Sequence, residues 1–125
     1  MLIKVTGDKY NFIDKNDLFV GYDTRTDCCE YADWDILDKP TRVFEMDERH
    51  SGEGLEDYVF DTASKVLGIE YTVSTEDLDE GDMVIFRLLH PTKEPLFLHI
   101  YNSHNGYYAH NALTNIPGFA KVIVL

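Results

Sequence analysis

The chain has 125 residues, of which 44% are hydrophobic, so we expect residues 1–125 to form one globular domain that buries its core without a metal ion or a disulfide. Its formal net charge of −12 argues against direct binding to nucleic acid or to an anionic membrane, because both would repel it. The sequence contains no stretch near the roughly 18 consecutive apolar residues of a membrane-spanning helix, no signal-peptide pattern and no disulfide framework. We therefore expect a cytoplasmic protein, either of a bacterium or of an infected bacterial host.

Strands are predicted in the first part of the chain, where β-branched and aromatic residues stand between glycine and proline residues. These strands cover residues 2–6, 17–22, 41–46, 58–61 and 70–73. Two stretches are ambiguous. Residues 27–37 fit a short helix or a packed loop, and residues 57–68 fit a helical stripe, with a strand nearly as good.

The later part of the chain gives the clearest strand patterns. Residues 74–82 predict a capped helical turn that ends at Gly81. Residues 83–89 follow, and they are apolar on both alternating faces apart from Arg87, which predicts a central strand covered on both sides. Further strands are predicted at residues 96–103, from Tyr107 onward and at residues 120–125. The predicted fold is a β-rich α+β domain, mostly antiparallel, with one or two short helices.

Residues 96–110 hold the densest group of chemically capable side chains. Asn105 and Gly106 form a typical two-residue hairpin turn, so the segment is expected to fold back on itself. The expected pairing sets Tyr101 opposite His110 and Ile100 opposite Asn111. Period-two alternation then gives the hairpin two faces. The first carries His99, Tyr101, Tyr108 and His110, and the second carries Asn102, His104, Tyr107 and Asn111.

His99 and His110 would be diagonal neighbours about 7 Å apart, close enough to share a metal ion or a small anion. Two histidines make an incomplete zinc site. Further ligands would have to come from residues such as Asp23, Asp27, Cys28, Cys29 or Glu30. Two other interpretations stay open. In the first, the tyrosines and histidines are structural, with their polar tips satisfied. In the second, they line a pocket for a small molecule or a peptide.

A second group of candidate residues lies at Asp27-Cys28-Cys29-Glu30. Asp27 fits a helix N-cap, with Glu30 three residues later as in a capping box. Both thiols would then lie near a helix N-terminus, where the thiolate is favoured, and a hairpin histidine could act as a base. The adjacent cysteines do not have the spacing of a zinc knuckle or a redox motif, and small buried cysteines are the alternative.

The acidic residues at 45–57 and 76–82 are expected to be solvated loops, because they lack the ligand spacing of an EF-hand. The sequence contains no P-loop, no dinucleotide-binding fingerprint and no nucleophile elbow, and no motif indicates a cofactor. A nucleotide ligand would need a basic lining, for which Arg25, Arg42 and Arg87 are the candidates.

Together, the Cys28-Cys29-Glu30 segment and the later His104-Asn-Gly-Tyr-Tyr108 segment resemble a family of small uncharacterised domains of bacteria and their phages. The order and the approximate placement of the two motifs match that family. The resemblance implies a phage or mobile-element context and brings no established activity.

Three functions are therefore considered. The first is a non-catalytic binding module of phage or mobile-element type, such as an inhibitor of host defence that acts on a protein or sequesters a small signal molecule. The second is a metal-dependent or cysteine/histidine hydrolase, and the third is a structural or assembly component. Self-association is compatible with each. The candidate ligand-binding residues are Tyr101, Asn102, His104, Asn105, Tyr107, Tyr108, His110, Cys28, Cys29 and Glu30.

Overall fold

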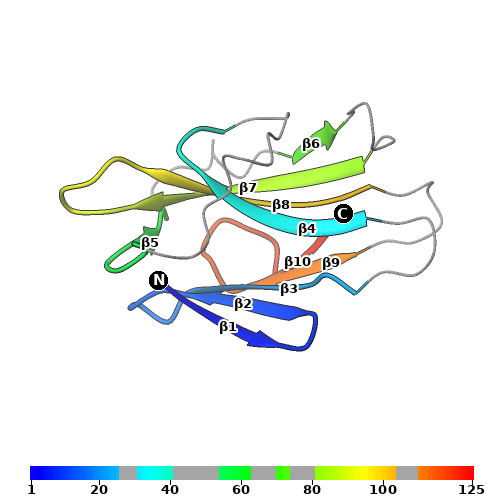
Figure 1. Cartoon of the computed structure of the whole chain (residues 1–125), viewed down its shortest axis with the longest axis horizontal. Helices are drawn as coiled ribbons and strands as arrows, with labels where there is room; N and C mark the ends of the chain where they lie inside the picture. The colour runs from blue at the N-terminus through cyan, green and yellow to red at the C-terminus, as the bar shows by residue number, and fades with distance from the viewer. Residues whose placement is uncertain (26–30, 41–53, 63–69, 74–80, 104–109) are drawn as a thin grey trace.

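The computed structural model describes residues 1–25, 31–40, 54–62, 70–73, 81–103 and 110–125, and these form ten strands in two antiparallel sheets (Figure 1). Sheet I has the strand order β1-β2-β3-β9-β10, and sheet II has the order β4-β8-β7-β5, with β6 also paired to β7. The strands of sheet I are β1 Leu2–Thr6, β2 Lys9–Ile13, β3 Phe19–Asp23, β9 Asn111–Thr114 and β10 Val122–Val124. Those of sheet II are β4 Tyr31–Leu37, β5 Val59–Phe60, β6 Glu70–Val73, β7 Gly81–Leu89 and β8 Leu96–Ser103.

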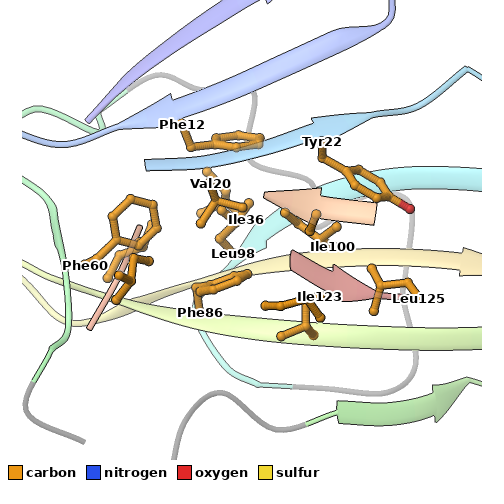
Figure 2. Close-up of a cluster of buried hydrophobic side chains, with 14 of the residues drawn as sticks. Phe12, Val20, Tyr22, Ile36, Phe60, Phe86, Leu98, Ile100, Ile123 and Leu125 are labelled. Atoms are coloured by element: carbon orange, nitrogen blue, oxygen red, sulfur yellow. The ribbon is translucent and has the colours of Figure 1, made fainter. Parts of the chain in front are cut away.

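The main hydrophobic core lies between the two sheets (Figure 2). Phe12, Val20 and Ile123 enter it from sheet I, and Phe86 and Ile100 enter it from sheet II, all with exposed fractions of 6% or less. Period-two alternation turns these side chains inward from both layers. The burial of this shared apolar surface holds the two sheets together.

Both faces of β7 are buried, which confirms the predicted central strand. Val84 and Phe86 face the main core, while Met83 and Ile85 belong to a second cluster with Phe97. Strand β7 pairs with β8 on one side and with β5 and β6 on the other. It begins at Gly81, two residues earlier than the sequence predicted, so Gly81 and Asp82 belong to this strand.

The strand at Tyr31–Leu37 corrects the prediction of a short helix or a packed loop. Apolar Ala32, Trp34 and Ile36 alternate with polar Asp33 and Asp35. Ile36 is fully buried in the main core, and Trp34 packs against that core. The alternation favours a half-buried strand, and it outweighs the helix-capping pattern that begins at Asp27.

The structure also adds strand β2, which pairs with β1 through a two-residue turn at Gly7 and Asp8. Gly7 has φ of 62°, as expected for the first central residue of a type II′ turn. No described residue is helical. The predicted helical turn at residues 74–80, the strand at 41–46 and the helical alternative for 63–68 lie outside the described residues.

The predicted hairpin pairing is wrong, because β8 is an inner strand of sheet II and β9 belongs to sheet I. Ile100 pairs with Trp34 and Val84 instead of Asn111, and Asn111 pairs with Val124. Both edges of β8 are occupied by β4 and β7. The chain therefore passes from sheet II to sheet I between Ser103 and His110, and the predicted turn itself, at residues 104–109, lies outside the described residues.

Candidate functional site

Three strand ends meet at one end of sheet II. Ser103, the last residue of β8, pairs with Tyr31 at the start of β4 and with Gly81 at the start of β7. The chain arrives at Tyr31 from residues 26–30 and leaves Ser103 into residues 104–109. The two motifs singled out in the sequence therefore join the described structure at directly paired residues, although the motifs themselves lie outside it.

The same end of the molecule is linked to sheet I by polar contacts. The Tyr22 hydroxyl group, from β3, donates a hydrogen bond of 3.0 Å to the Tyr101 carbonyl oxygen in β8. The ring of His110, just before β9, packs against Tyr22 in a tilted arrangement with the ring centroids 6.3 Å apart. We call this region the crossover end, and define it by Tyr31, Gly81 and Ser103 of sheet II together with Tyr22 and His110 on the side of sheet I.

Among the candidate ligand-binding residues, only Tyr101, Asn102 and His110 lie within the described part of the chain. The others lie outside it: Cys28, Cys29, Glu30, His104, Asn105, Tyr107 and Tyr108.

Tyr101 is buried, with an exposed fraction of 3%. Its hydroxyl group donates a hydrogen bond of 3.0 Å to Oδ2 of Asp35, which is also 3% exposed. The side chain lies on the face of sheet II that points away from the main core, in the cluster with Met83 and Phe97. Tyr101 therefore supports the crossover end from within: its side chain fixes β8 to β4, and its carbonyl group holds Tyr22.

Asn102 points the other way, towards the inside of the sandwich, and is 1% exposed. Its Nδ2 donates a hydrogen bond of 2.9 Å to the Leu125 carbonyl oxygen. The backbone groups of Leu125 exchange two further hydrogen bonds with His110. Oδ1 of Asn102 is buried and has no hydrogen-bond partner among the described residues. Asn102 thus links β8 to the last residues of sheet I, which is a structural role.

His99 is fully buried, and its strand β8 pairs with β4 and β7 rather than with the segment that holds His110. It pairs with Asp35 and Ile85 on the face of sheet II that points away from the main core, whereas His110 contacts Tyr22 on the core side. The predicted diagonal pairing of His99 with His110 is therefore wrong, and the metal or anion site loses the geometry from which it was predicted. The prediction failed because it assumed that β8 pairs with the segment that follows it.

Burial lowers the pKa of His99 from 6.5 to about 4, and hydrogen bonding to the backbone of Phe97 and Asp35 only partly offsets this effect. Nδ1 lies 3.0 Å from the Phe97 carbonyl oxygen. Because a carbonyl oxygen can only accept, Nδ1 carries the proton and donates it. His99 is therefore a neutral, hydrogen-bonded residue of the interior at neutral pH.

Two residues of this region were not singled out from the sequence. Tyr22 alternates with Val20 in a predicted strand, and this pattern marks both as core residues without indicating the hydroxyl contact. Asp35 lies in the alternating stretch Tyr31–Leu37, where a buried carboxylate requires a donor such as Tyr101.

In the described part of the chain, no group of three or more His, Cys, Asp or Glu side chains is arranged to hold a metal ion. The described residues also include no helix that is long and apolar enough to cross a membrane. Comparisons of the chain with protein-family models, with curated proteins and with solved structures found no match.

Proposed function

We propose that the protein is a non-catalytic binding module whose contact with its partner is made at the crossover end. The pairing of Tyr31 with Ser103 is the observation that carries this proposal, because it brings the entry and exit points of the two motif segments together. Segments that connect the elements of a rigid sandwich commonly provide its binding residues. The contacts of Tyr22, Tyr101 and Asn102 supply that rigid support.

The charge distribution favours a basic protein surface as the partner. Residues 1–25 contain four bases and four acids: Lys4, Lys9, Lys15 and Arg25 against Asp8, Asp14, Asp17 and Asp23. Residues 110–125 contain Lys121 and neither Asp nor Glu. Residues 26–109 hold every strand of sheet II and both motif segments. They contain six bases and 19 acids and so carry a net charge of −13. A net negative charge of this size would attract a basic partner.

The resemblance of the two motifs to phage and bacterial domains supports a role in a phage or mobile element. An inhibitor of host defence that holds a host protein fits an acidic surface, and sequestration of a small signal molecule is the second form of the same proposal. The proposed site of action is the bacterial cytoplasm.

Capture from a bacterial lysate on the immobilised chain tests the proposal. We expect a basic protein to be retained at low salt and released as salt rises, because screening weakens the attraction between the partners. The double variant His104→Ala/Tyr107→Ala should lose that protein. Tyr58→Phe, a tyrosine change beside Glu94 near the opposite end of β8, should keep it. Equal retention by both variants, or none by the wild type, would overturn the proposal for a protein partner.

Native mass spectrometry of protein purified without chelator or metal resin separates the remaining candidates. Extra mass of a nucleotide or similar molecule, lost in the His104→Ala/Tyr107→Ala variant, would support sequestration. Extra mass of zinc or iron would favour the hydrolase. In that case His104→Ala and His110→Ala should abolish turnover without lowering the melting temperature.

A further inference from the structure

The loop that joins β7 to β8, residues 90–95, lies at the end of sheet II opposite the crossover end. Its sequence is His90-Pro-Thr-Lys-Glu-Pro95, and the two prolines have no backbone N–H group to donate. No hydrogen bond between two backbone groups of this loop is found among the described residues. The loop is therefore not closed as an ordinary backbone turn is, and side chains supply the contacts that hold it.

The His90 ring accepts hydrogen bonds from two backbone groups of the loop. The N–H groups of Thr92 and Lys93 both donate to Nδ1 of His90, each over 3.0 Å. The Thr92 hydroxyl group lies 3.4 Å from the same nitrogen atom. A backbone N–H group can only donate, so Nδ1 carries no proton and the neutral ring has its proton on Nε2. The observed loop conformation thus requires the neutral ring, and one of its two tautomers.

Tyr58 holds the other side of the loop. Its hydroxyl group donates a hydrogen bond of 2.8 Å to the Glu94 carbonyl oxygen. Its ring packs against the His90 ring in a tilted arrangement, with the ring centroids 5.0 Å apart. Tyr58 is buried and His90 is half-buried, whereas Thr92 and Lys93 are exposed. The loop is therefore anchored on a buried tyrosine while its own backbone faces the solvent.

We propose that this loop is a pH-sensitive switch, which is closed while His90 is neutral and opens when the ring is protonated. Protonation puts a hydrogen atom on Nδ1 and turns this acceptor into a donor. The N–H groups of Thr92 and Lys93 then face another donor, so both hydrogen bonds are lost. Because closure and protonation exclude each other, the closed loop is favoured at higher pH. Histidine side chains change charge between about pH 8 and pH 5, and the loop should open within this range.

His90 is the group whose titration controls the switch. The titratable side chains of the two segments that meet at this residue are Lys93 and Glu94 of the loop and Glu56, Asp57 and Tyr58 before β5. Burial and, to a smaller extent, the Glu94 carboxylate raise the pKa of Tyr58 above its ordinary value of 10.0, so Tyr58 keeps its proton in mild acid. The acceptor of both backbone hydrogen bonds is the His90 ring nitrogen itself. A change of charge on the other side chains therefore does not remove that acceptor.

NMR spectroscopy of the isotope-labelled chain between about pH 8 and pH 5 tests this inference without a binding partner. At the upper end of the range, the ring nitrogen signals of His90 should identify the tautomer with its proton on Nε2. As pH falls, the amide signals of Thr92 and Lys93 should move in step with protonation of that ring. The amide signal of Phe86, at the centre of sheet II, should not follow them, because the opening is local.

His90→Asn is the matched control. Asparagine side chains accept hydrogen bonds from backbone N–H groups shortly after them in the chain, and they do not titrate. This variant should keep the amide signals of Thr92 and Lys93 constant over the whole range. His90→Ala should have an open loop throughout. Its Thr92 and Lys93 amides should be protected from hydrogen exchange roughly fivefold less than those of the wild type at the upper end of the range, since each loses one hydrogen bond.

Three results would overturn the inference. The first is a proton on Nδ1 of His90 at the upper end of the pH range. The second is a pair of Thr92 and Lys93 amide signals that do not follow protonation of the ring. The third is a pH dependence of these signals in His90→Asn that is as large as in the wild type. None of these results depends on the crossover end, so the switch and the proposed binding function are tested separately.

Discussion

Tyr31 and Ser103 face each other across β4 and β8, and each lies next to one of the two motifs that distinguish this sequence. Glu30 immediately precedes Tyr31, and His104 immediately follows Ser103. More than 70 residues of chain separate the two motifs, and one pair of strands brings their attachment points together. The candidate site is therefore a product of the sheet register rather than of a local hairpin.

Tyr22 should stabilise the packing of the two sheets through its hydroxyl group. Tyr22→Phe removes the 3.0 Å hydrogen bond to the Tyr101 carbonyl oxygen but keeps the ring in the core. We expect the free energy of unfolding to fall by about 1 kcal/mol. Tyr10→Phe is the control, because no hydrogen bond of the Tyr10 hydroxyl is found within the described residues. The free energies of unfolding of the two variants can be measured by urea denaturation. Equal values would contradict this role for Tyr22.

Tyr101 should contribute more, because its hydroxyl group donates to a buried carboxylate. Tyr101→Phe removes this donor from Oδ2 of Asp35, a residue that is only 3% exposed. A hydrogen bond to a charged group is worth about 2 kcal/mol, so the loss of stability should exceed that of Tyr22→Phe. In a double-mutant cycle with Asp35→Asn, the two changes should not be additive. Additive losses would show that the two side chains do not act together.

Asp14 is expected to be the carboxylate whose loss costs most stability among those described here. Its Oδ1 accepts hydrogen bonds from the backbone N–H groups of Asn16 and Leu18, and its Oδ2 accepts one from Phe60 in the other sheet. Asp14→Ala should lower the free energy of unfolding by about 3 kcal/mol, because three backbone donors lose their acceptor. Asp8→Ala, in the exposed turn between β1 and β2, should change it by less than about 0.5 kcal/mol. Similar melting temperatures for the two variants would contradict this assignment.

His99 should make the fold less stable in mild acid. The pKa of His99 is lowered by burial to about 4 in the folded chain, whereas the ordinary value of 6.5 applies in the unfolded chain. Between these values the unfolded state binds more protons than the folded state, so stability rises with pH. As pH falls from about 6.5 to about 4, this residue should cost the fold about 3 kcal/mol.

Comparison of the wild type with His99→Gln isolates that contribution from the many carboxylates of the chain. Glutamine keeps a donor for the Phe97 carbonyl oxygen and does not titrate. Denaturant unfolding as a function of pH should therefore show a shallower loss of stability in the variant below about pH 6.5. Parallel curves for the two proteins would show that His99 does not remain neutral in the fold.

Local pattern was sufficient for much of the fold. The bounds of β1, β6 and β8 agree with the predicted residues 2–6, 70–73 and 96–103, because β-branched and aromatic residues dominate these runs. Strand β7 has apolar residues on both alternating faces, and this pattern correctly predicted that both faces are buried. Strand β2 had a usable signal as well, in the Gly7-Asp8 turn and in the alternation of Lys9, Tyr10, Asn11 and Phe12.

Pairing between distant segments could not be read from local pattern. The Asn105-Gly106 signal indicated a turn, but which strands flank β8 depends on how the whole sandwich packs. Both neighbours of β8 are strands remote from residues 104–109, and β9 pairs with β3 and β10 instead. The two faces predicted for the hairpin, and the pairing of His99 with His110, depended on that assumption and were wrong for this reason. Tyr22 could be placed on a strand, whereas residues 27–37, which include Asp35, were predicted as a short helix or a packed loop. The contacts of both side chains required the packed structure.

The most direct test of binding at the crossover end compares two substitutions that change the charge equally. Glu30→Lys alters the residue next to Tyr31. Glu94→Lys alters an exposed residue before the opposite end of β8. The hydrogen bond that Tyr58 donates to Glu94 goes to the backbone carbonyl oxygen, so the substitution keeps it. The affinity of each variant for the protein captured by the wild type should be measured by calorimetry at one salt concentration. We predict a large loss of affinity for Glu30→Lys and a small one for Glu94→Lys. Equal losses would show that only the overall charge matters and would contradict a binding site at the crossover end.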